Sequence, residues 1–369
     1  MREGWEYKTI ENCTSIEYGT RVVQKRDGGT IFPVYGGGGE TFRMDRYNRE
    51  DCLIIARFAM SPRCVRYVAG KFFLNDSGLS VKSKEELEQA YLNYHLLFFN
   101  DVIYHLGKGA AQRNLDVKAF RQLVIAIPPK PTQLSIVSEL DKLNELIQIK
   151  KEQLKDYDAL AQSIFYEMFG DPVENEKGWE VKKLMEICDV RDGTHDSPKY
   201  VESSNYMLIT SKNIVNRAIS FDDVNYITEE DYNNINKRSK VDDGDIIMPM
   251  IGTIGNPVIV YLDNIHKFSI KNVALIKFFH NTSILNRYLL ELMISDSFRK
   301  YLLSLNKGGT QKFVALGTIR RMDIILPPLP LQQSFAHKIE QIERQKAAVQ
   351  STITDLETLL AARMQYWFD

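Results

Sequence analysis

Two glycine-rich segments of this chain, 199 residues apart, carry side chains suited to contact a nucleic acid. Cations neutralise phosphate oxygens, whereas guanidinium groups and amides make paired hydrogen bonds with base edges. Both segments combine these types: Lys108, Gln112 and Arg113 in the first, and Lys307, Thr310, Gln311 and Lys312 in the second. We expect both to lie close to a phosphate backbone. The alternative is a glycine-rich turn whose cations are merely solvated.

Further candidates for nucleic-acid contact are cationic, polar or aromatic residues in expected loops. They are Thr194, His195, Lys212 and Asn213 in the second half of the chain, and Arg21, Lys25, Arg26 and Tyr35 in the first. His195 fits a surface loop equally well, and the glycines after Tyr35 are also typical of a hairpin tip. Arg57, Arg63 and Arg66 flank expected strands, and alternation does not decide which of them faces a groove.

No group of residues in the sequence has the spacing of a known active site. The segments Glu6-x-Lys8 and Glu180-x-Lys182 match the end of a metal-dependent nuclease motif, but no aspartate precedes the first copy to hold the metal. The Pro-Pro pairs do not follow the Asn or Asp of an amino-methyltransferase motif, and the six histidines lack ligand spacing. We expect no catalytic residue, metal or cofactor in this chain.

The candidate segments belong to an internal repeat. A match at a constant offset of 199 residues runs from the pair Lys108/Lys307 to the pair Phe169/Phe368. A Gly-Trp-Glu triplet near the N-terminus recurs at an offset of only 174 residues. The second copy must therefore contain 25 additional residues in its middle. A repeated frame with variable contents predicts two recognition modules on one scaffold.

Each copy ends in a long helical pattern that follows a Pro-Pro-x-Pro segment. Apolar residues recur every 3.5 residues on average, which is typical of a coiled-coil seam. The helices are expected to pair antiparallel; the alternative is two amphipathic helices on separate cores. Lys150 and Lys346 interrupt the seam, and the first helix is expected to end at Gly170. The seam residues are Ile136, Leu140, Leu143, Ile147, Leu154 and Tyr157 in the first helix, and Ile339, Ile342, Val349, Ile353, Leu356 and Leu360 in the second.

Both modules are predicted to be α+β. Strands are expected at 52–56, 65–68 and 72–74 in the first module and at 206–210, 245–250, 257–261 and 273–278 in the second, with helices at 84–100 and 283–305. The predicted fold is two recognition domains joined by two long helices in an antiparallel coiled coil, a pseudo-two-fold internal repeat. Its parts are domain 1 (1–130), a central spacer helix and linker (131–177), domain 2 (178–330) and a C-terminal spacer helix (331–369).

Composition favours a protein of the cytoplasm. No apolar stretch reaches the length of a membrane span, and four scattered cysteines fit reduced thiols. The net charge is −1, but residues 1–130 hold 19 Lys and Arg against 15 Asp and Glu, while 131–177 hold 5 against 10. This distribution permits local phosphate-binding patches without demonstrating them.

The chain resembles the specificity subunits of type I restriction-modification systems over essentially its whole length. The resemblance is carried by the repeated helices together with YGGGG (35–39), ITSKNI (209–214), GDI (244–246), IGTIGN (251–256), KNVALI (271–276), GGTQK (308–312) and LPPLP (326–330). It implies that each target recognition domain reads one half of a bipartite, asymmetric target in double-stranded DNA. It also implies docking of two modification (methyltransferase) subunits, which would bring S-adenosylmethionine, and the possible addition of a restriction/translocase subunit.

Two other functions remain open from the residues alone. A bivalent adaptor could grip protein rather than DNA through the same two modules. A nuclease with an unusual site would cleave DNA in a metal-dependent way. The resemblance favours a non-catalytic specificity subunit whose helices set the gap between two half-sites.

Overall fold

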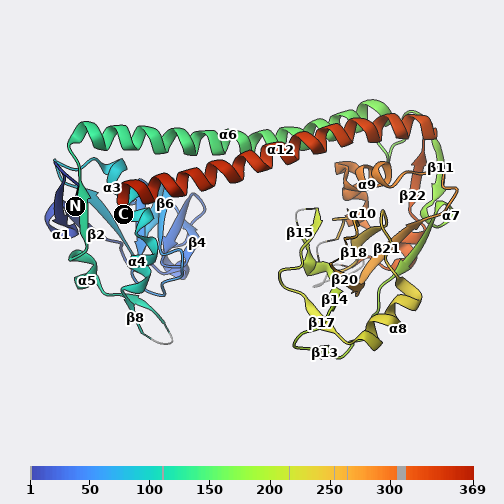
Figure 1. Cartoon of the computed structure of the whole chain (residues 1–369), viewed down its shortest axis with the longest axis horizontal. Helices are drawn as coiled ribbons and strands as arrows, with labels where there is room; N and C mark the ends of the chain where they lie inside the picture. The colour runs from blue at the N-terminus through green and yellow to red at the C-terminus, as the bar shows by residue number, and fades with distance from the viewer. Residues whose placement is uncertain (1, 110–111, 216, 253, 264, 306–312) are drawn as a thin grey trace. The chain divides into compact units, whose positions relative to one another are not determined.

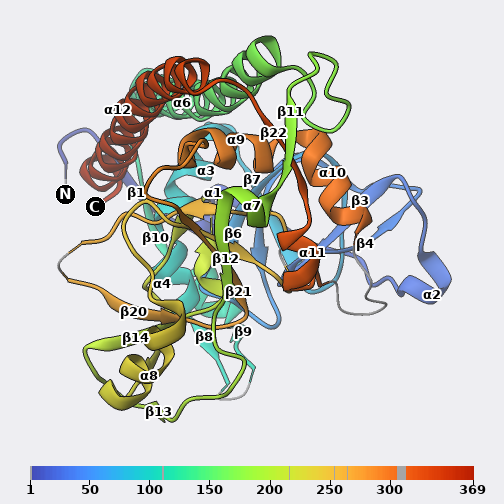
Figure 2. The same cartoon turned by 90° about the vertical axis from the view of Figure 1, so that its right-hand side faces the viewer.

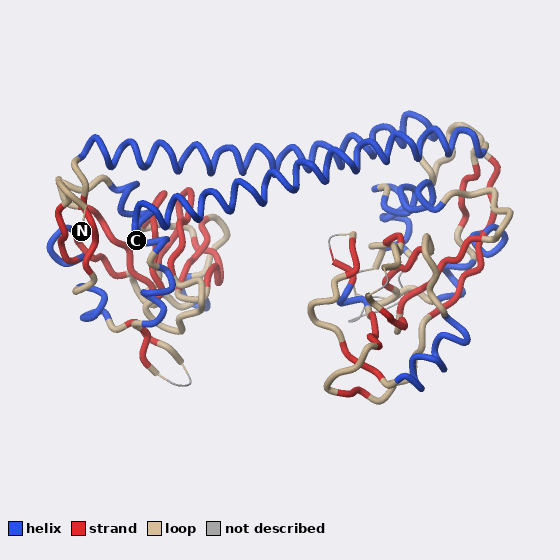
Figure 3. Tube along the Cα trace, in the orientation of Figure 1, coloured by secondary structure: helices blue, strands red, loops and turns tan. Residues whose placement is uncertain are grey.

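The computed structural model describes residues 2–109, 112–215, 217–252, 254–263, 265–305 and 313–369. Contacts between residues divide the chain into two compact units. Unit 1 contains the residues up to Glu152 together with Gln350–Asp369, and unit 2 contains Gln153–Val349. Each unit therefore combines one globular module with parts of two long helices (Figure 3).

The module of unit 1 is built on a six-stranded sheet (Figure 1). In sheet order its strands are β2 (Thr14–Tyr18), β7 (Gly78–Ser83), β5 (Arg49–Ala56), β6 (Val65–Leu74), β3 (Phe32–Gly36) and β4 (Gly39–Met44). All neighbours are antiparallel except β3 and β6, which are parallel. Because side chains alternate along a strand, Leu53, Ile55 and Leu79 face one buried core while Ile54 faces another.

Short elements surround this sheet. They are α1 (Ile10–Cys13), α2 (Gln24–Asp27), α3 (Gln89–Phe98), α4 (Asn100–His105), β8 (Gly107–Lys108), β9 (Asn114–Leu115), α5 (Val117–Arg121), and the antiparallel pair β1 (Glu6–Thr9) and β10 (Val124–Ile127). Helix α3 contributes Tyr91, Leu92 and Leu96 to the main core of the unit.

The module of unit 2 contains two four-stranded sheets. One has the order β12 (Cys188–Asp192), β21 (Val273–Phe278), β18 (Ile246–Pro249) and β19 (Val258–Ile259), and the other has the order β13 (Tyr200–Val201), β17 (Asn225–Ile227), β14 (Tyr206–Ile209) and β20 (Lys267–Ile270). The remaining elements are the pair β11 (Glu180–Lys183) and β22 (Asp323–Leu326), α7 (Leu184–Ile187), η1 (Ser211–Asn213), β15 (Ile214–Val215), β16 (Ala218–Ile219), α8 (Glu229–Ser239), α9 (Asn286–Ile294), α10 (Asp296–Ser304) and α11 (Leu316–Arg320).

Most predicted strands are confirmed, but several boundaries differ. The helix expected at 84–100 begins only at Gln89, as α3, and a separate helix, α4, begins at Asn100. The expected helix at 283–305 is two helices, α9 and α10, which separate at Ser295. Ser295 is buried in an extended backbone conformation, and its hydroxyl donates to Leu292 O at 2.7 Å, so the side chain satisfies a carbonyl at the helix end. The strands expected at 65–68 and 72–74 form one strand, β6, which passes through Gly70.

The internal repeat extends into the modules. Strand β3 runs parallel to β6 in unit 1, and β14 runs parallel to β20 in unit 2. The amide of Asn75 donates to Tyr35 O at 2.9 Å, and the amide of Lys271 donates to Ile209 O at the same distance. Tyr35 and Ile209 are 174 residues apart, which is the offset of the N-terminal triplet. The 25 additional residues of the second copy therefore lie after Ile209, where β15, β16, β17 and α8 are found.

The two long helices, α6 (Lys130–Phe169) and α12 (Leu329–Phe368), pair antiparallel (Figures 1 and 2). In unit 1, Arg363 bonds to Glu139, whereas Glu357 pairs with Lys151 farther along α6. In unit 2, Lys346 pairs with Asp158 at 2.8 Å. Every predicted seam residue is buried or half-buried. The coiled coil is thus confirmed, and α6 ends before Gly170, whose φ of +75° favours glycine.

A buried glutamine near the start of each long helix attaches that helix to its module. The fully buried Gln133 donates to Pro128 O at 2.9 Å and Glu86 O at 3.0 Å, and it accepts from Glu88 N. Gln332 makes the equivalent three hydrogen bonds in unit 2.

The C-terminal end of α12 packs against the core of unit 1, and the C-terminal end of α6 packs against the core of unit 2. Phe368, at the end of α12, lies 5.4 Å from the Tyr91 ring, and Phe169, at the end of α6, lies 4.8 Å from the Tyr288 ring. Each unit therefore holds the start of one helix and the end of the other. No helix in the described part of the chain has the length and apolarity needed to span a bilayer.

Candidate nucleic-acid interface

Several loops of unit 1 meet at one end of its sheet. Residues 19–21, 35–37, 57–60, 75–77 and 113–115 form this group, which we call loop cluster 1. Backbone hydrogen bonds hold the loops together: Arg57 N donates to Ser77 O at 2.8 Å, and Met60 N donates to Arg113 O at 2.9 Å. The glycine-rich segment singled out by its sequence is thereby fixed beside loops that are distant in the chain.

Two glycines permit this close approach. A Cβ atom on Gly37 would lie 2.1 Å from Phe58 O, and one on Gly19 would lie 1.9 Å from Asn75 O. Both neighbours are backbone carbonyl oxygens of paired segments, which cannot move aside cheaply. Any larger residue at either position would therefore separate the loops of cluster 1.

The side chains predicted from the glycine-rich segment have different roles. Lys108 is exposed and forms an ion pair of 2.5 Å with Asp116, which also caps the N-terminus of α5. This lysine is the first cause of the lowered pKa of Asp116. Arg113 lies over the Tyr104 ring at 4.7 Å and donates to Tyr104 O at 3.3 Å. Gln112 is exposed.

Two further arginines border loop cluster 1. The Arg57 guanidinium lies between the rings of Tyr18, at 4.9 Å, and Phe58, at 4.6 Å. Arg66 is bonded to backbone carbonyls, at 3.2 Å from Gly37 O and 2.7 Å from Arg63 O. Arg66 therefore supports the loops, whereas the donors of Arg57 are directed at no carbonyl or carboxylate among the described residues.

Loop cluster 2 is the equivalent group in unit 2 and contains residues 193–195, 209–213, 250–251, 271–272 and 313–314. Thr194 N donates to Ile270 O at 3.0 Å, matching Thr20 N and Leu74 O in unit 1. Val314 N donates to Met250 O at 2.9 Å, matching Leu115 N and Arg57 O. The two modules thus present the same set of loops with different side chains.

His195 occupies the position in loop cluster 2 that Arg21 occupies in loop cluster 1. One ring nitrogen lies 3.0 Å from Asn272 Oδ1 and the other 2.7 Å from Asp192 Oδ2. Two oxygen acceptors favour the doubly protonated ring, so these bonds to Asn272 and Asp192 raise the pKa of His195. Arg238 also binds Asp192. Both modules therefore place a basic side chain directly after the Gly-Thr pair.

Other predicted site residues lie in different settings. Lys25 and Arg26 are exposed on α2, which packs beside the edge strand β4 rather than in loop cluster 1. Tyr35 packs edge-on against Phe72, at 5.5 Å between ring centroids. Lys212 pairs with Asp223 at 3.2 Å. Lys307, Thr310, Gln311 and Lys312 lie outside the described residues.

Asn213, another predicted contact, uses both the oxygen and the nitrogen of its amide within unit 2. The side chain is 3% exposed. Its oxygen accepts from Thr210 N and Thr210 Oγ1, both at 3.0 Å, and its nitrogen donates to Asp223 O at 2.9 Å. In this structure the residue shapes the loop of η1 rather than presenting an amide to a ligand.

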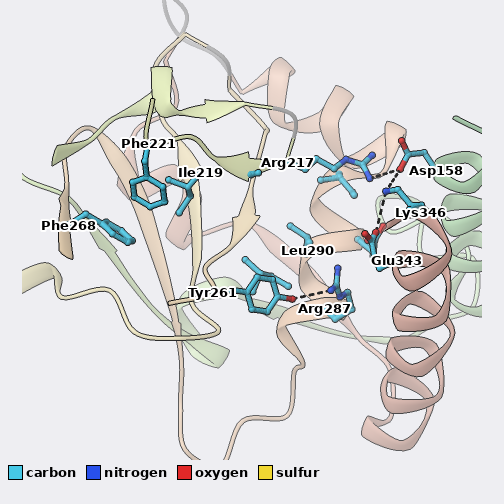
Figure 4. A pocket seen from close by; sticks show the side chains of 14 residues that line it. Asp158, Arg217, Ile219, Phe221, Tyr261, Phe268, Arg287, Leu290, Glu343 and Lys346 are labelled. Carbon is cyan, nitrogen blue, oxygen red and sulfur yellow. Dashed lines mark hydrogen bonds and ion pairs between the residues drawn. The ribbon is translucent and has the colours of Figure 1, made fainter. Parts of the chain in front are cut away.

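A cavity of about 590 Å³ lies between the helices and the module of unit 2, away from loop cluster 2 (Figure 4). Asp158 on α6 pairs with Arg217 at 3.2 Å and with Lys346, and Lys346 also reaches Glu343 at 3.3 Å. Glu291, at 2% exposure, has its pKa raised by burial and accepts from Gln162 at 3.3 Å. These charges largely satisfy one another, so the cavity is a junction within unit 2 with no reacting group identified.

The sequence missed the partners that complete both loop clusters. Tyr18, Phe58, Asp192 and Arg238 were not singled out, because none belongs to a motif. One signal was available for two of them: Tyr18 and Asp192 directly precede the repeated Gly-Thr pair. Extending the 174-residue offset from that pair to Tyr35 and Ile209 would also have located the related loops.

Comparison with known proteins shows the family to which the two modules belong. Residues 3–156 and 176–358 match the model of the family described as the type I restriction modification DNA specificity domain. The chain belongs to this specificity-domain family. The resemblance expected from the sequence is confirmed, and the protein is a DNA specificity subunit of a type I restriction-modification system.

Curated relatives and solved structures agree with this specificity-domain assignment. The chain is 25% identical over 299 residues to a type I restriction enzyme specificity subunit of Methanocaldococcus jannaschii, covering 74% of this chain and 70% of the relative. A putative type I restriction enzyme specificity subunit of Haemophilus influenzae is 24% identical to this chain, and the match covers 92% of this chain and 87% of the relative.

Among solved structures, the M. genitalium specificity subunit has a TM-score of 0.55 at 15% identity, with coverage of 99% of this chain and 96% of the other. A chain from a study of type I complex assembly and conformational transition has a TM-score of 0.58 at 17% identity, with coverage of 99% and 97%. These two likenesses support the fold of the specificity subunit, with two α+β modules and paired long helices.

Proposed function

We propose that each unit reads one half of a bipartite, asymmetric target in double-stranded DNA. The observation that carries this proposal is the equivalence of the two loop clusters. Their backbones are held by matching hydrogen bonds, whereas their side chains differ at matching positions. Arg57 of loop cluster 1 is replaced by Met250 in loop cluster 2, and Tyr18, directly before loop cluster 1, is replaced by Asp192. Equivalent loops with unlike side chains suit two half-sites of unlike sequence.

The helices are proposed to set the gap between the half-sites. Each helix has 40 residues and is about 60 Å long, at about 1.5 Å per residue. Each takes part in both units, and its attachment through Gln133 or Gln332 is buried. A change in helix length would therefore be transmitted to the gap instead of being absorbed in a loose linker.

The same helices are proposed to dock two modification (methyltransferase) subunits. Large apolar residues of α6 remain exposed outside the seam, among them Leu134, Leu146, Ile149 and Leu160. Exposed apolar residues along a charged helix are typical of a surface covered by a partner. A restriction/translocase subunit is proposed to join this complex, which would act in the cytoplasm.

Chemistry is assigned to the partners, not to this chain. The modification subunits would bind S-adenosylmethionine and transfer its methyl group to a flipped adenine in each half-site. This chain would supply no catalytic residue, metal or cofactor. Incubation of the isolated chain with duplex DNA and Mg²⁺ tests that assignment: the DNA should remain intact, and metal-dependent cleavage would contradict it.

Methylation mapping tests the recognition role directly. The full chain is produced with the modification subunits of its own system in a host without other adenine methyltransferases, and methylated adenines are located by single-molecule sequencing. One motif with two defined parts and a constant gap is expected. The control is the same modification subunits without this chain. A contiguous motif, or methylation that persists in the control, would refute the proposal.

A further inference from the structure

We propose that Arg57 reads a guanine in the half-site bound by unit 1. This inference rests on the proposed DNA-reading function and adds a specificity-determining residue to it. Arg57 stands in loop cluster 1 and is not part of the repeated glycine-rich segment. Its neighbours fix its position, and its hydrogen-bond donors remain available.

The Arg57 backbone is fixed by two neighbouring loops. Its amide donates to Ser77 O at 2.8 Å, and its carbonyl accepts from Leu115 N at 2.9 Å. The side chain is fixed as well, because the guanidinium lies 4.9 Å from the Tyr18 ring centroid and 4.6 Å from that of Phe58. Aromatic faces attract a guanidinium while leaving its edge free.

The edge of this guanidinium has no acceptor among the described residues. An arginine carries five N–H donors in a planar fork, and two neighbouring arginines, Arg66 and Arg113, use some of theirs on backbone carbonyls. Arg66 donates to Gly37 O and Arg63 O, and Arg113 donates to Tyr104 O. No hydrogen bond or ion pair of the Arg57 side chain is found within the ranges that the structure describes. The Arg57 side chain is thus held in place while its hydrogen-bond donors remain unused.

Guanine is the base whose major-groove edge matches such a fork. It presents O6 and N7 as adjacent acceptors, and arginine binds both with two parallel hydrogen bonds. A phosphate could also accept two bonds, but a contact with phosphate does not require a fixed plane. Tyr18 and Phe58 are 43% and 36% exposed, so this stack stands at the surface where a groove could receive it.

The repeat restricts the proposed contact to one half-site. Met250 accepts from Val314 N as Arg57 accepts from Leu115 N, so the two residues occupy equivalent positions. Methionine has no hydrogen-bond donor on its side chain. Asp192 occupies the place in unit 2 that Tyr18 occupies in unit 1. Unit 2 therefore lacks both the guanidinium and one wall of its stack.

The test uses the full chain assembled with its modification subunits and a duplex library randomised across both half-sites. Arg57→Met copies the residue at the equivalent position of unit 2, and Arg57→Lys keeps the charge but removes the fork. Arg43→Lys is the matched control, because Arg43 is an arginine of the same unit that pairs with Glu40. Equilibrium binding to each duplex is measured at two salt concentrations.

Both Arg57 variants should lose about 5- to 100-fold of the preference for guanine at one position of the first half-site. Preferences in the second half-site and those of Arg43→Lys should not change. The inference is overturned if the first half-site contains no preferred guanine, or if both variants retain its preference. It is also overturned if Arg57→Met weakens binding equally for all sequences with a shallower salt dependence, which indicates a phosphate contact. Failure of the proposed function would look different, because the unaltered complex would then show no sequence preference.

Discussion

Replacing His95 should make the stability of unit 1 much less sensitive to acid. This histidine is 1% exposed and lies among aromatic rings, at 4.6 Å from Phe99 and 4.9 Å from Phe368. Burial lowers the pKa of His95 to about 4, from an ordinary value of 6.5. The folded unit therefore requires the neutral ring, and protonation favours the unfolded chain.

The direction and size of the effect follow from these two pKa values. The stabilisation linked to the neutral ring is fully present above about pH 6.5 and is lost as the pH falls from there towards 4. At about 1.4 kcal/mol per pH unit, the loss over that window is about 3 kcal/mol. This is a large fraction of the stability of an ordinary domain.

The informative variant is His95→Leu, because the equivalent position of unit 2 is Leu292, which is also fully buried. At neutral pH the variant exchanges the aromatic contacts of the ring for those of a leucine, loses a long hydrogen bond of 3.4 Å from Ala126 N, and removes a ring nitrogen that has no partner. Its stability at pH 7 should therefore stay within about 1 kcal/mol of the parent. The exposed His105 provides the control substitution, His105→Gln.

Urea unfolding of the full chain, followed by tryptophan fluorescence at several values between pH 7.5 and 4, measures these differences. The parent and His105→Gln should both lose stability as the pH falls, whereas His95→Leu should lose about 3 kcal/mol less over the whole pH 6.5 to 4 window. Parallel curves for the parent and His95→Leu would show that the ring is not buried in its neutral form, and the reasoning would fail.

Three further predictions concern the helices and loop cluster 2. Adding one helical turn after Lys151, with a matching turn in α12, should lengthen the gap of the methylated motif by about two base pairs and leave both half-sites unchanged; an unaltered gap would refute it. Gln332→Leu should lower the free energy of unfolding by about 2–4 kcal/mol, because it leaves three buried backbone groups unpaired, whereas the exposed neighbour Gln333→Leu should change it little. In the parent, DNA affinity should weaken as the pH rises through the raised pKa of His195, and His195→Gln should remove this pH dependence. Equal pH profiles of DNA affinity for the parent and the variant would argue against a DNA contact.

The long helices could be predicted from the sequence because their information is local and periodic. Apolar residues at an average spacing of 3.5 fix one buried side, and Gly170 ends the first helix where its positive φ is needed. The pairing of the two helices could also be predicted, because two similar seams in one chain are each other's nearest partners. The buried Gln133 and Gln332 were visible as repeated residues, but two of the three hydrogen bonds of each depend on loops far away in the chain.

The loop clusters could be predicted only in part. Arg113, at the end of the glycine-rich segment, and the loop at 193–195 were found by composition, and both belong to the clusters. The stack around Arg57 was not, because Tyr18 is 39 residues away and reaches it only through the order of the sheet strands. Asn213 resembled a base-reading amide in the sequence, yet burial and three hydrogen bonds occupy its side chain. Side-chain occupancy of this kind depends on tertiary contacts that no local pattern encodes.

Exchange of one module tests the central proposal most directly. Residues 178–325 are replaced by the corresponding segment of a relative with a different target, both long helices are kept, and the methylated motif is mapped in the modified strain. The proposal predicts that one half of the motif changes while the other half and the gap are retained. A motif that changes in both halves, or that does not change at all, would contradict the reading of each half-site by a separate unit.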